Sequence, residues 1–242
     1  MRFIGLGTTM RIPAEACGCG ACTAATLTRR SLFAGAGAGL LTGVPIYARA
    51  QTDLTPAQAL ARLMEGNQRF IAGRLTSDSE DLAVLRQGTA EKQEPFASVL
   101  SCSDSRVPVE LIFDQSIGHV FVARVAGNIA SSDVVASLEY GAAVLGTKVI
   151  LVLGHANCGA VKAAIQGKAA PGRISALYSA IHPAVVRAGP DLTAVIRANA
   201  RLQARLVRDS SPVISELAKQ GRIEVTAGYY DLASGRVSPI EL

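Results

Sequence analysis

Hydrophobic residues recur along the chain at two spacings, one typical of helices and one typical of buried strands. Residues 56–72 carry apolar side chains at helical intervals, and Thr55 followed by Pro56 is a typical helix start. Residues 148–153 are apolar without interruption after Lys148, which is typical of a strand buried on both faces of a sheet. The pattern therefore predicts amphipathic helices packed around buried strands.

Further elements are expected to alternate along the chain. The apolar and β-branched runs predict strands over 96–101 and 119–125 and a last strand over 222–229 that closes the domain. Helical spacing predicts helices over 132–145, 159–166 and 185–220. Strands that alternate with helices predict an α/β protein with a central, mostly parallel β-sheet flanked by helices.

The expected helical region 185–220 carries arginines at regular intervals. Such a run indicates either an anion-binding face or an ordinary solvated helix surface, and the second is the commoner meaning. We expect one apolar side formed by Leu202, Leu206, Ile214 and Leu217, and a solvated side with Arg197, Arg201, Arg205 and Arg208.

The first 50 residues have the order of an export signal. The pair Arg29-Arg30 precedes a Gly/Ala-rich apolar run that extends to about Tyr47, and Ala48-Arg49-Ala50 is a small-x-small cleavage pattern. The apolar run is shorter than the roughly 20 residues of a spanning helix. We therefore expect residues 1–50 to be a cleaved twin-arginine signal, the protein to be periplasmic or secreted, and no stable membrane anchor.

Three of the five cysteines lie within that leader. The spacing of Cys17, Cys19 and Cys22 would allow metal binding or disulfides. Their position ahead of the signal favours an unstructured pre-sequence, or translation that starts at Met10.

The formal net charge of +5 is concentrated in the same segment. Residues 1–50 hold five arginines and one glutamate, which is +4 of the total, so residues 51–242 are near neutral. A near-neutral domain has no basic excess to attract nucleic acid or anionic lipid. Residues 51–242 are expected to form one compact domain, and we expect no nucleic-acid partner.

The other two cysteines each follow a predicted buried strand. Cys102 comes directly after the strand 96–101, and His155 and Cys158 follow within five residues of the end of the strand 148–153. Thiolate sulfur and imidazole nitrogen are preferred zinc ligands, and a catalytic zinc site uses three protein ligands with a fourth position open. Ligand sites of α/β proteins commonly lie at the carboxyl ends of parallel strands. The pattern predicts a zinc site.

Two alternatives to zinc involve the same cysteines. A Cys102–Cys158 disulfide is possible in an oxidising compartment, but it leaves His155, Asp104 and Arg106 unexplained. A thiol-disulfide redox protein would need a closely spaced pair such as Cys-x-x-Cys, which these two residues do not form. Zinc binding is therefore the preferred interpretation.

Several ordered motifs resemble those of the β-class carbonic anhydrases over nearly all of residues 51–242. The matching stretches are Glu65-Gly66-Asn67-Gln68-Arg69-Phe70, Cys102-Ser103-Asp104-Ser105-Arg106 with its continuation to Gln115, Arg124-Val125-Ala126-Gly127-Asn128, Ser137-Leu138-Glu139-Tyr140, Leu153 to Val161, and Gly228-Tyr229-Tyr230-Asp231.

The resemblance implies zinc-dependent, reversible hydration of carbon dioxide to bicarbonate, through a zinc-bound hydroxide, in a homodimer or higher homo-oligomer. It implies one Zn²⁺ per subunit on Cys102, His155 and Cys158, with Asp104 and Arg106 as the catalytic pair. In the plant-like branch of the family, the substrate-binding positions correspond to Gln93, Phe121, Tyr140 and Gly159. The chain has no tryptophan, so the non-catalytic bicarbonate site of the other branch is not expected.

Charge explains why Asp104 and Arg106 are needed. Two thiolates cancel the charge of Zn²⁺, so the site acidifies its bound water less than a three-histidine site does, and Asp104 can help by accepting a hydrogen bond. Arg106 can pair with Asp104 and keep it ionised and turned away from the metal. We hypothesise that when this pairing breaks at low pH, Asp104 becomes the fourth zinc ligand and switches the enzyme off.

Two other functions would use the same ligands. A related zinc hydrolase could act on carbonyl sulfide or carbon disulfide, with a pocket of different shape. A non-catalytic zinc-binding module would have a closed fourth position and no hydration activity.

Overall fold

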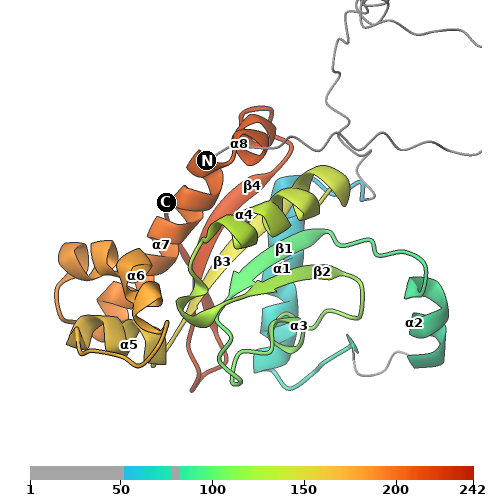
Figure 1. Ribbon diagram of the computed structural model, residues 1–242. Helices are drawn as coiled ribbons and strands as arrows, with labels where there is room; N and C mark the ends of the chain where they lie inside the picture. Colours follow the sequence, from blue (N-terminus) through green and yellow to red (C-terminus); the bar gives the residue numbers. More distant parts are fainter. Residues whose placement is uncertain (1–51, 78–81) are drawn as a thin grey trace, which may run out of the picture. The chain divides into compact units, whose positions relative to one another are not determined.

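The computed structural model describes residues 52–77 and 82–242, which contain a five-stranded sheet in the order β2-β1-β3-β4-β5 (Figure 1). The first four strands are parallel, and β5 runs antiparallel to β4. The strands are β1 (Ala97–Ser101), β2 (Val120–Arg124), β3 (Val149–His155), β4 (Glu224–Tyr230) and β5 (Val237–Ile240). The expected mostly parallel α/β architecture is confirmed.

Helices cover both faces of this sheet. The α-helices are α1 (Pro56–Ile71), α2 (Leu82–Thr89), α3 (Val109–Ile112), α4 (Ser132–Glu139), α5 (Gly159–Gln166), α6 (Ser175–Ala188), α7 (Leu192–Ser210) and α8 (Pro212–Lys219). A 3₁₀ turn, η2 (Ala126–Asn128), follows β2, and a π-helical turn, η3 (Tyr140–Val144), extends α4. Helix α1 crosses one face of the sheet, and α4 and α7 cross the other (Figure 1).

Strand β3 shows how the two faces are divided. All seven of its residues are buried, and successive side chains point to opposite faces. Val149, Leu151 and Leu153 pack in the cluster that contains α1, whereas Ile150 and Val152 pack in the cluster that contains α7. This two-sided burial explains the uninterrupted apolar run by which the sequence marked this strand.

The predicted start of α1 is confirmed in detail. Thr55 accepts a hydrogen bond from the backbone N–H of Gln58, and the Gln58 side chain accepts one from the backbone N–H of Thr55. These reciprocal bonds satisfy two donors that the first turn of a helix leaves free.

The expected helical region over 185–220 is confirmed, but it is divided among three helices, and the first of them begins earlier, at Ser175. Helix α6 ends at Gly189, whose φ of 75° favours glycine. Asp191 then accepts a hydrogen bond from the Ala194 N–H at the start of α7, and Ser211 does the same for Ile214 at the start of α8.

The apolar side expected for this region is partly wrong, because Leu206 is 40% exposed. The buried side of α7 contains no leucine and consists of Val195, Ile196, Asn199, Ala200, Gln203, Ala204 and Val207. A side chain added at Gly154 of β3 would meet Ile196 and Ala200 at 3.1–3.3 Å. Helix α7 therefore approaches β3 closely at Gly154, where a side chain on the strand would not fit without a shift of its neighbours.

The arginines of α7 are half-buried and bind to the protein surface around them. The Arg197 guanidinium lies 4.4 Å from the centre of the Tyr229 ring, and Arg201 donates from Nε to the Glu241 carbonyl. Arg208 pairs with its neighbour Asp209. Three of the four arginines therefore make specific contacts on a surface that the sequence indicated only as solvated.

The prediction that strand 222–229 closes the domain is wrong, because β5 follows it. Strand β5 has four residues, lies at the edge of the sheet, and contains Pro239 opposite Gly228. Proline weakens the sequence signal of a strand but is tolerated at a sheet edge. The short helices α2 and α3 were not predicted.

The proposed leader, with Arg29-Arg30 and Cys17, Cys19 and Cys22, lies outside the described residues. Within the described part, no helix combines the length and apolar character needed to cross a membrane.

Candidate metal centre and active site

Two neighbouring parallel strands place the predicted zinc ligands at the same end of the sheet, where the strands have their carboxyl ends. Strands β1 and β3 pair in parallel, with Ser101 opposite Leu153. Cys102 follows directly after β1, and His155 is the last residue of β3. Cys158 comes one short turn later and is the N-cap residue of α5.

The three ligand atoms meet in a buried cluster. The Sγ atoms of Cys102 and Cys158 and a ring nitrogen of His155 all lie within 4.8 Å of one another, and all three residues are buried. Zinc bonds of about 2.0–2.3 Å in tetrahedral geometry put ligand atoms about 3.4–3.8 Å apart. The cluster is therefore of the right size for one zinc ion after small side-chain adjustments.

His155 offers a free lone pair to that cluster. Its Nδ1 lies 2.9 Å from the Ala156 carbonyl oxygen, a contact that assigns the proton to Nδ1. Its Nε2 is buried and makes no hydrogen bond within the described residues. A buried nitrogen without a partner is costly in a folded protein unless a ligand uses it. The donor set therefore fits a metal such as zinc.

The two thiols are free and act on each other. Cys102 and Cys158 form no disulfide. A hydrogen bond from Cys158 lowers the pKa of the Cys102 thiol to about 4, helped by His155 and by the backbone N–H of Gly127. The same contact, together with burial, raises the pKa of Cys158. The pair thus shares one proton, which a bound divalent cation would displace.

Asp104 and Arg106 form a tight pair next to these ligands. Arg106 donates from Nε to Asp104 Oδ1 at 2.9 Å and from Nη2 to Oδ2 at 2.8 Å, and its backbone N–H also binds Oδ1 at 3.0 Å. Asp104 Oδ2 lies 3.8 Å from His155 Nε2. These bonds from Arg106 hold the pKa of Asp104 well below its usual range. The carboxylate therefore stays ionised and borders the ligand cluster.

Arg124 holds the loop that carries Cys102 and Asp104. It ends β2 and donates from Nε to the Cys102 carbonyl at 3.0 Å and from Nη2 to the Asp104 carbonyl at 2.6 Å. Arg124 belongs to one of the motifs that carry the family resemblance, but sequence reasoning assigned it no role. The signal was present in the motif, whereas its use depends on the pairing of β1 with β2.

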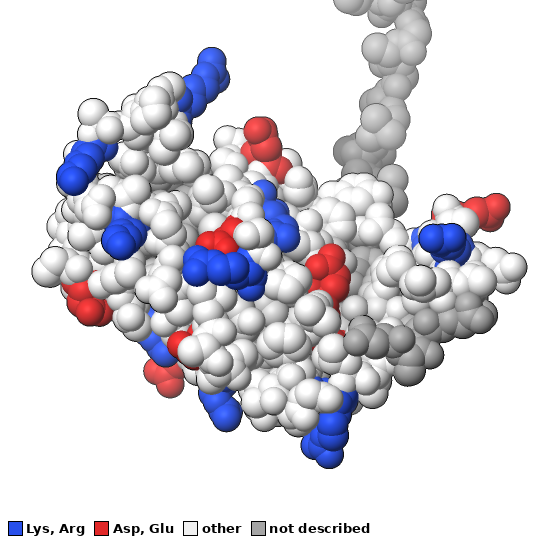
Figure 2. Space-filling view, turned by 90° about the horizontal axis from the view of Figure 1, so that it is seen from below, with Lys and Arg blue, Asp and Glu red and all other residues white. Residues whose placement is uncertain are grey.

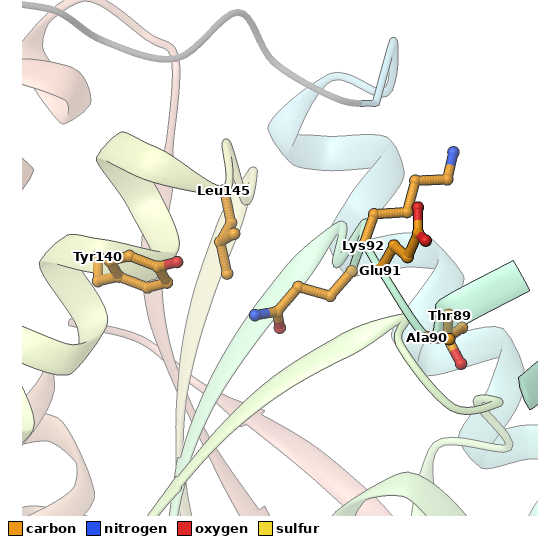
Figure 3. Close-up of a pocket in the computed structure, with 7 residues that line it drawn as sticks. Thr89, Ala90, Glu91, Lys92, Tyr140 and Leu145 are labelled. Atoms are coloured by element: carbon orange, nitrogen blue, oxygen red, sulfur yellow. The ribbon is translucent and has the colours of Figure 1, made fainter.

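Gln93, Phe121 and Tyr140 form a second group, which lies apart from the ligand cluster of the same chain. Gln93 and Tyr140 line one pocket of about 500 Å³. The ring centres of Tyr140 and Phe121 are 6.2 Å apart. Figure 3 shows Tyr140 and Leu145 on one side of this pocket and the 89–92 segment on the other. Phe121 pairs with Ser98, four residues before Cys102, which is about 13 Å along a strand.

Gly159 lies beside Cys158 and faces open space. A side chain added at this glycine would meet no atom within 4 Å. The first turn of α5 begins here, and hydrogen bonds from the backbone N–H groups of Val161 and Ala160 lower the pKa of the Cys158 thiol, although Cys102 and burial raise it more strongly. The expected position of Gly159 next to a zinc ligand therefore leaves room for a small molecule.

Charged side chains are dispersed on the face seen in Figure 2, which is viewed from below relative to Figure 1. Basic and acidic groups form small separate clusters, several of them in contact with the opposite sign, with uncharged surface between them. This face offers no continuous basic track of the kind that binds a phosphate backbone.

The fold and the ligand cluster define a class of protein: an α/β enzyme with a Cys-His-Cys zinc centre beside an ionised aspartate. The family profile described as carbonic anhydrase matches residues 97–237. Carbonic anhydrase 2 of Mycobacterium tuberculosis is 35% identical over 192 residues, covering 76% of this chain and 92% of that protein. The chain therefore belongs to the β-class carbonic anhydrase family and is a zinc enzyme of carbon dioxide hydration.

Solved structures agree with this assignment. The β-carbonic anhydrase CcaA superimposes with a TM-score of 0.59 at 26% identity, covering 75% of this chain and 87% of that one. A tetrameric β-carbonic anhydrase from Sordaria macrospora shares the fold, with a TM-score of 0.58 at 24% identity over 66% of this chain and 91% of that one.

Proposed function

We propose that this protein hydrates carbon dioxide reversibly with one zinc ion held by Cys102, His155 and Cys158, and with Asp104 and Arg106 as its catalytic pair. The observation that carries the proposal is the buried ligand cluster with the ionised Asp104 at its border. When bound, zinc supplies Lewis-acid activation of water at neutral pH. A purely structural zinc module would need a fourth protein ligand that closes the site, whereas the nearest candidate, Asp104, has its carboxylate bound by Arg106.

The roles of Asp104 and Arg106 follow from their hydrogen-bonding capacity. An ionised carboxylate only accepts hydrogen bonds, so Asp104 can accept one from the attacking water and aim the water's lone pair at the carbon of carbon dioxide. Arg106 donates to this carboxylate from Nε and Nη2 of its guanidinium and from its backbone N–H. It thereby fixes the acceptor in one orientation, which is a form of preorganisation.

Asp104 is also a candidate fourth metal ligand. Its Oδ2 lies 3.8 Å from His155 Nε2, a separation compatible with two ligands of one zinc ion. We infer that the carboxylate exchanges between Arg106 and the metal, and that the exchanged form, favoured at lower pH, is inactive. Hydration activity that rises from pH 6 to pH 9 would support this exchange, and activity that stays flat or falls would contradict it.

A second copy of the chain is proposed to complete the substrate pocket. Gln93, Phe121 and Tyr140 occupy the family's substrate-binding positions, yet they lie apart from the ligand cluster of their own chain. Tyr140 is 47% exposed and Val144 is 46% exposed, so the surface next to this group is apolar and available for contact. The tetrameric state described for the Sordaria macrospora proteins is consistent with such assembly.

Export is proposed from Arg29-Arg30, the apolar run after it and Ala48-Arg49-Ala50. A route that carries folded proteins would allow zinc to be bound inside the cell, where thiols stay reduced, and the metal would then protect both sulfurs outside. Cell fractionation with Arg29→Lys and Arg30→Lys together tests this. Export that persists in the double variant, or exported protein without zinc and with a Cys102–Cys158 disulfide, would contradict it.

Stopped-flow measurement with metal analysis of the purified protein tests the activity. We expect one zinc per chain and rapid hydration of carbon dioxide. Carbonyl sulfide and carbon disulfide are assayed in parallel, because a related hydrolase would use the same ligands. Turnover of these sulfur compounds without hydration of carbon dioxide would replace the proposed substrate, and a zinc-loaded protein inactive on all three would contradict catalysis.

A further inference from the structure

We propose that Asn199 and Gln203 of α7 are positioning residues for the zinc centre, acting on Cys102 through the turn that contains Gly127. The proposal rests on the zinc centre described above but adds two residues from a helix that supplies none of its ligands. Both side chains are fully buried. They lie on the core face of a helix whose neighbouring buried positions include Val195, Ile196 and Ala200.

The turn η2 makes direct contact with a zinc ligand. The Gly127 N–H donates a hydrogen bond to Cys102 Sγ, with the nitrogen 3.3 Å from the sulfur. A hydrogen bond to a ligand atom orients it and reduces the negative charge that it carries. The position of this one N–H therefore affects how Cys102 meets a metal.

The conformation of the turn is demanding. Gly127 has a φ of 75°, which residues with a side chain rarely adopt. A Cβ at this position would meet Ile181 Cδ1 at 2.8 Å and Ala160 Cβ at 3.3 Å. The backbone thus passes closely between α5 and α6, and something must hold it in the orientation that directs its N–H at the sulfur.

The two amides supply that support. Asn199 donates from Nδ2 to the Gly127 carbonyl at 2.9 Å, and Gln203 donates from Nε2 to Asn199 Oδ1 at 3.1 Å. Gln203 also donates to the Ala180 carbonyl at 3.0 Å and accepts from the Ala130 N–H at 2.8 Å. A continuous chain of hydrogen bonds therefore runs from α6 and α7 through Gly127 to the Cys102 sulfur.

The burial of Asn199 and Gln203 indicates that their hydrogen bonds matter to the structure. Amide side chains are costly to bury unless their hydrogen bonds are satisfied, and a satisfied buried network favours a single arrangement. Here the two amides bond to Gly127 within η2 and to Ala130 just after it, both in the segment that follows β2. We conclude that α7 holds the turn in the conformation that binds Cys102.

Zinc affinity, measured by competition with a chromophoric chelator, tests the proposal independently of activity. Asn199→Leu keeps the size of the side chain but removes its donor, and should weaken zinc binding about 10- to 100-fold, as for other groups that orient metal ligands. Gln203→Met acts one step further from the sulfur and should weaken binding less. In the cobalt-substituted protein, both variants should also shift the sulfur-to-cobalt charge-transfer absorption.

Thr147→Val is the matched control. The Thr147 hydroxyl bonds to that of Ser98 at 3.0 Å, both residues are buried, and Ser98 lies four residues before Cys102 on β1. This variant should lower the melting temperature while zinc affinity and the cobalt spectrum stay unchanged. Equal losses of zinc affinity in Thr147→Val and Asn199→Leu would overturn the proposal, because general destabilisation would then explain both.

Wild-type zinc affinity in both amide variants would also overturn it. Should Asn199→Leu not fold, Gln203→Met carries the test by itself. Failure of the proposed function has a different signature: a wild-type protein that binds zinc without hydrating carbon dioxide would remove the activity and leave the positioning role of Asn199 intact.

Discussion

The zinc-ligand cluster and the pocket of Gln93 and Tyr140 differ in how much of each a single chain completes. Cys102, His155 and Cys158 are buried and meet within 4.8 Å, whereas Tyr140 is half-exposed and its pocket contains none of the three. The metal centre is therefore a property of one folded chain. The proposed substrate-binding group includes the half-exposed Tyr140, and we propose that a second copy completes it.

The largest effect is expected for a ligand. His155→Ala removes the buried Nε2 that has no other partner, so the protein should lose zinc and hydration should fall to background. Metal analysis and stopped-flow assays measure both. The matched control is His182→Ala, which changes an exposed histidine on α6. Full zinc content in His155→Ala would show that this histidine is not a ligand.

A smaller loss is expected for Asp104→Asn, which should keep zinc and reduce hydration about 100-fold, as is typical when a preorganised hydrogen-bonding group is lost. The amide presents one acceptor and one donor group, so it cannot replace the carboxylate held by Arg106. The control is Asp209→Asn, which removes a carboxylate from the exposed pair with Arg208. Unchanged turnover in Asp104→Asn would exclude Asp104 from the mechanism.

Val144→Asp tests the other region. A charge on this half-exposed apolar residue of η3 should separate the copies and lower hydration severalfold, while zinc content stays at one per chain. Analytical ultracentrifugation and activity at several protein concentrations measure the effect. Val186→Asp, at a valine that is 72% exposed on α6, should change neither. If the copies still assemble in Val144→Asp, the contact between them does not involve this residue.

The smallest effect on activity is expected for Asp114→Asn, which acts on stability. Burial raises the pKa of Asp114, but bonds from Ser77, Arg69 and Thr76 outweigh it and lower the pKa well below the usual range. A lowered folded-state pKa gives stability that is present above the unfolded value of about 3.9 and lost as pH falls below it. Wild-type protein should lose urea resistance below about pH 4.

The variant should be less stable at pH 7 by about 1–3 kcal/mol, the cost of losing bonds to a buried group, and its stability should depend less on acid. Urea denaturation at pH 7 and pH 3.5 measures both. An acid dependence equal to that of wild type would mean that other carboxylates cause it. Zinc content at pH 7 should not change, because Asp114 lies outside the ligand cluster.

Much of the chemistry was predictable from short segments. The largely apolar run before Cys102 and the uninterrupted apolar run before His155 indicate buried strands, and residues that follow parallel strands emerge at the same end of the sheet. The ligand types themselves indicate zinc. Local patterns also predicted α1, because its cap and its apolar spacing are contained within a few neighbouring residues.

The tertiary structure alone decided which polar groups serve the metal centre from a distance. Asn199 and Gln203 are ordinary polar residues in the sequence, and only the packing of α7 brings them to Gly127. The same holds for Arg124, whose bonds to the loop after β1 require the pairing of two strands. Residue type and local spacing determine which ligands are available, but hydrogen bonds between distant segments depend on packing that no local pattern encodes.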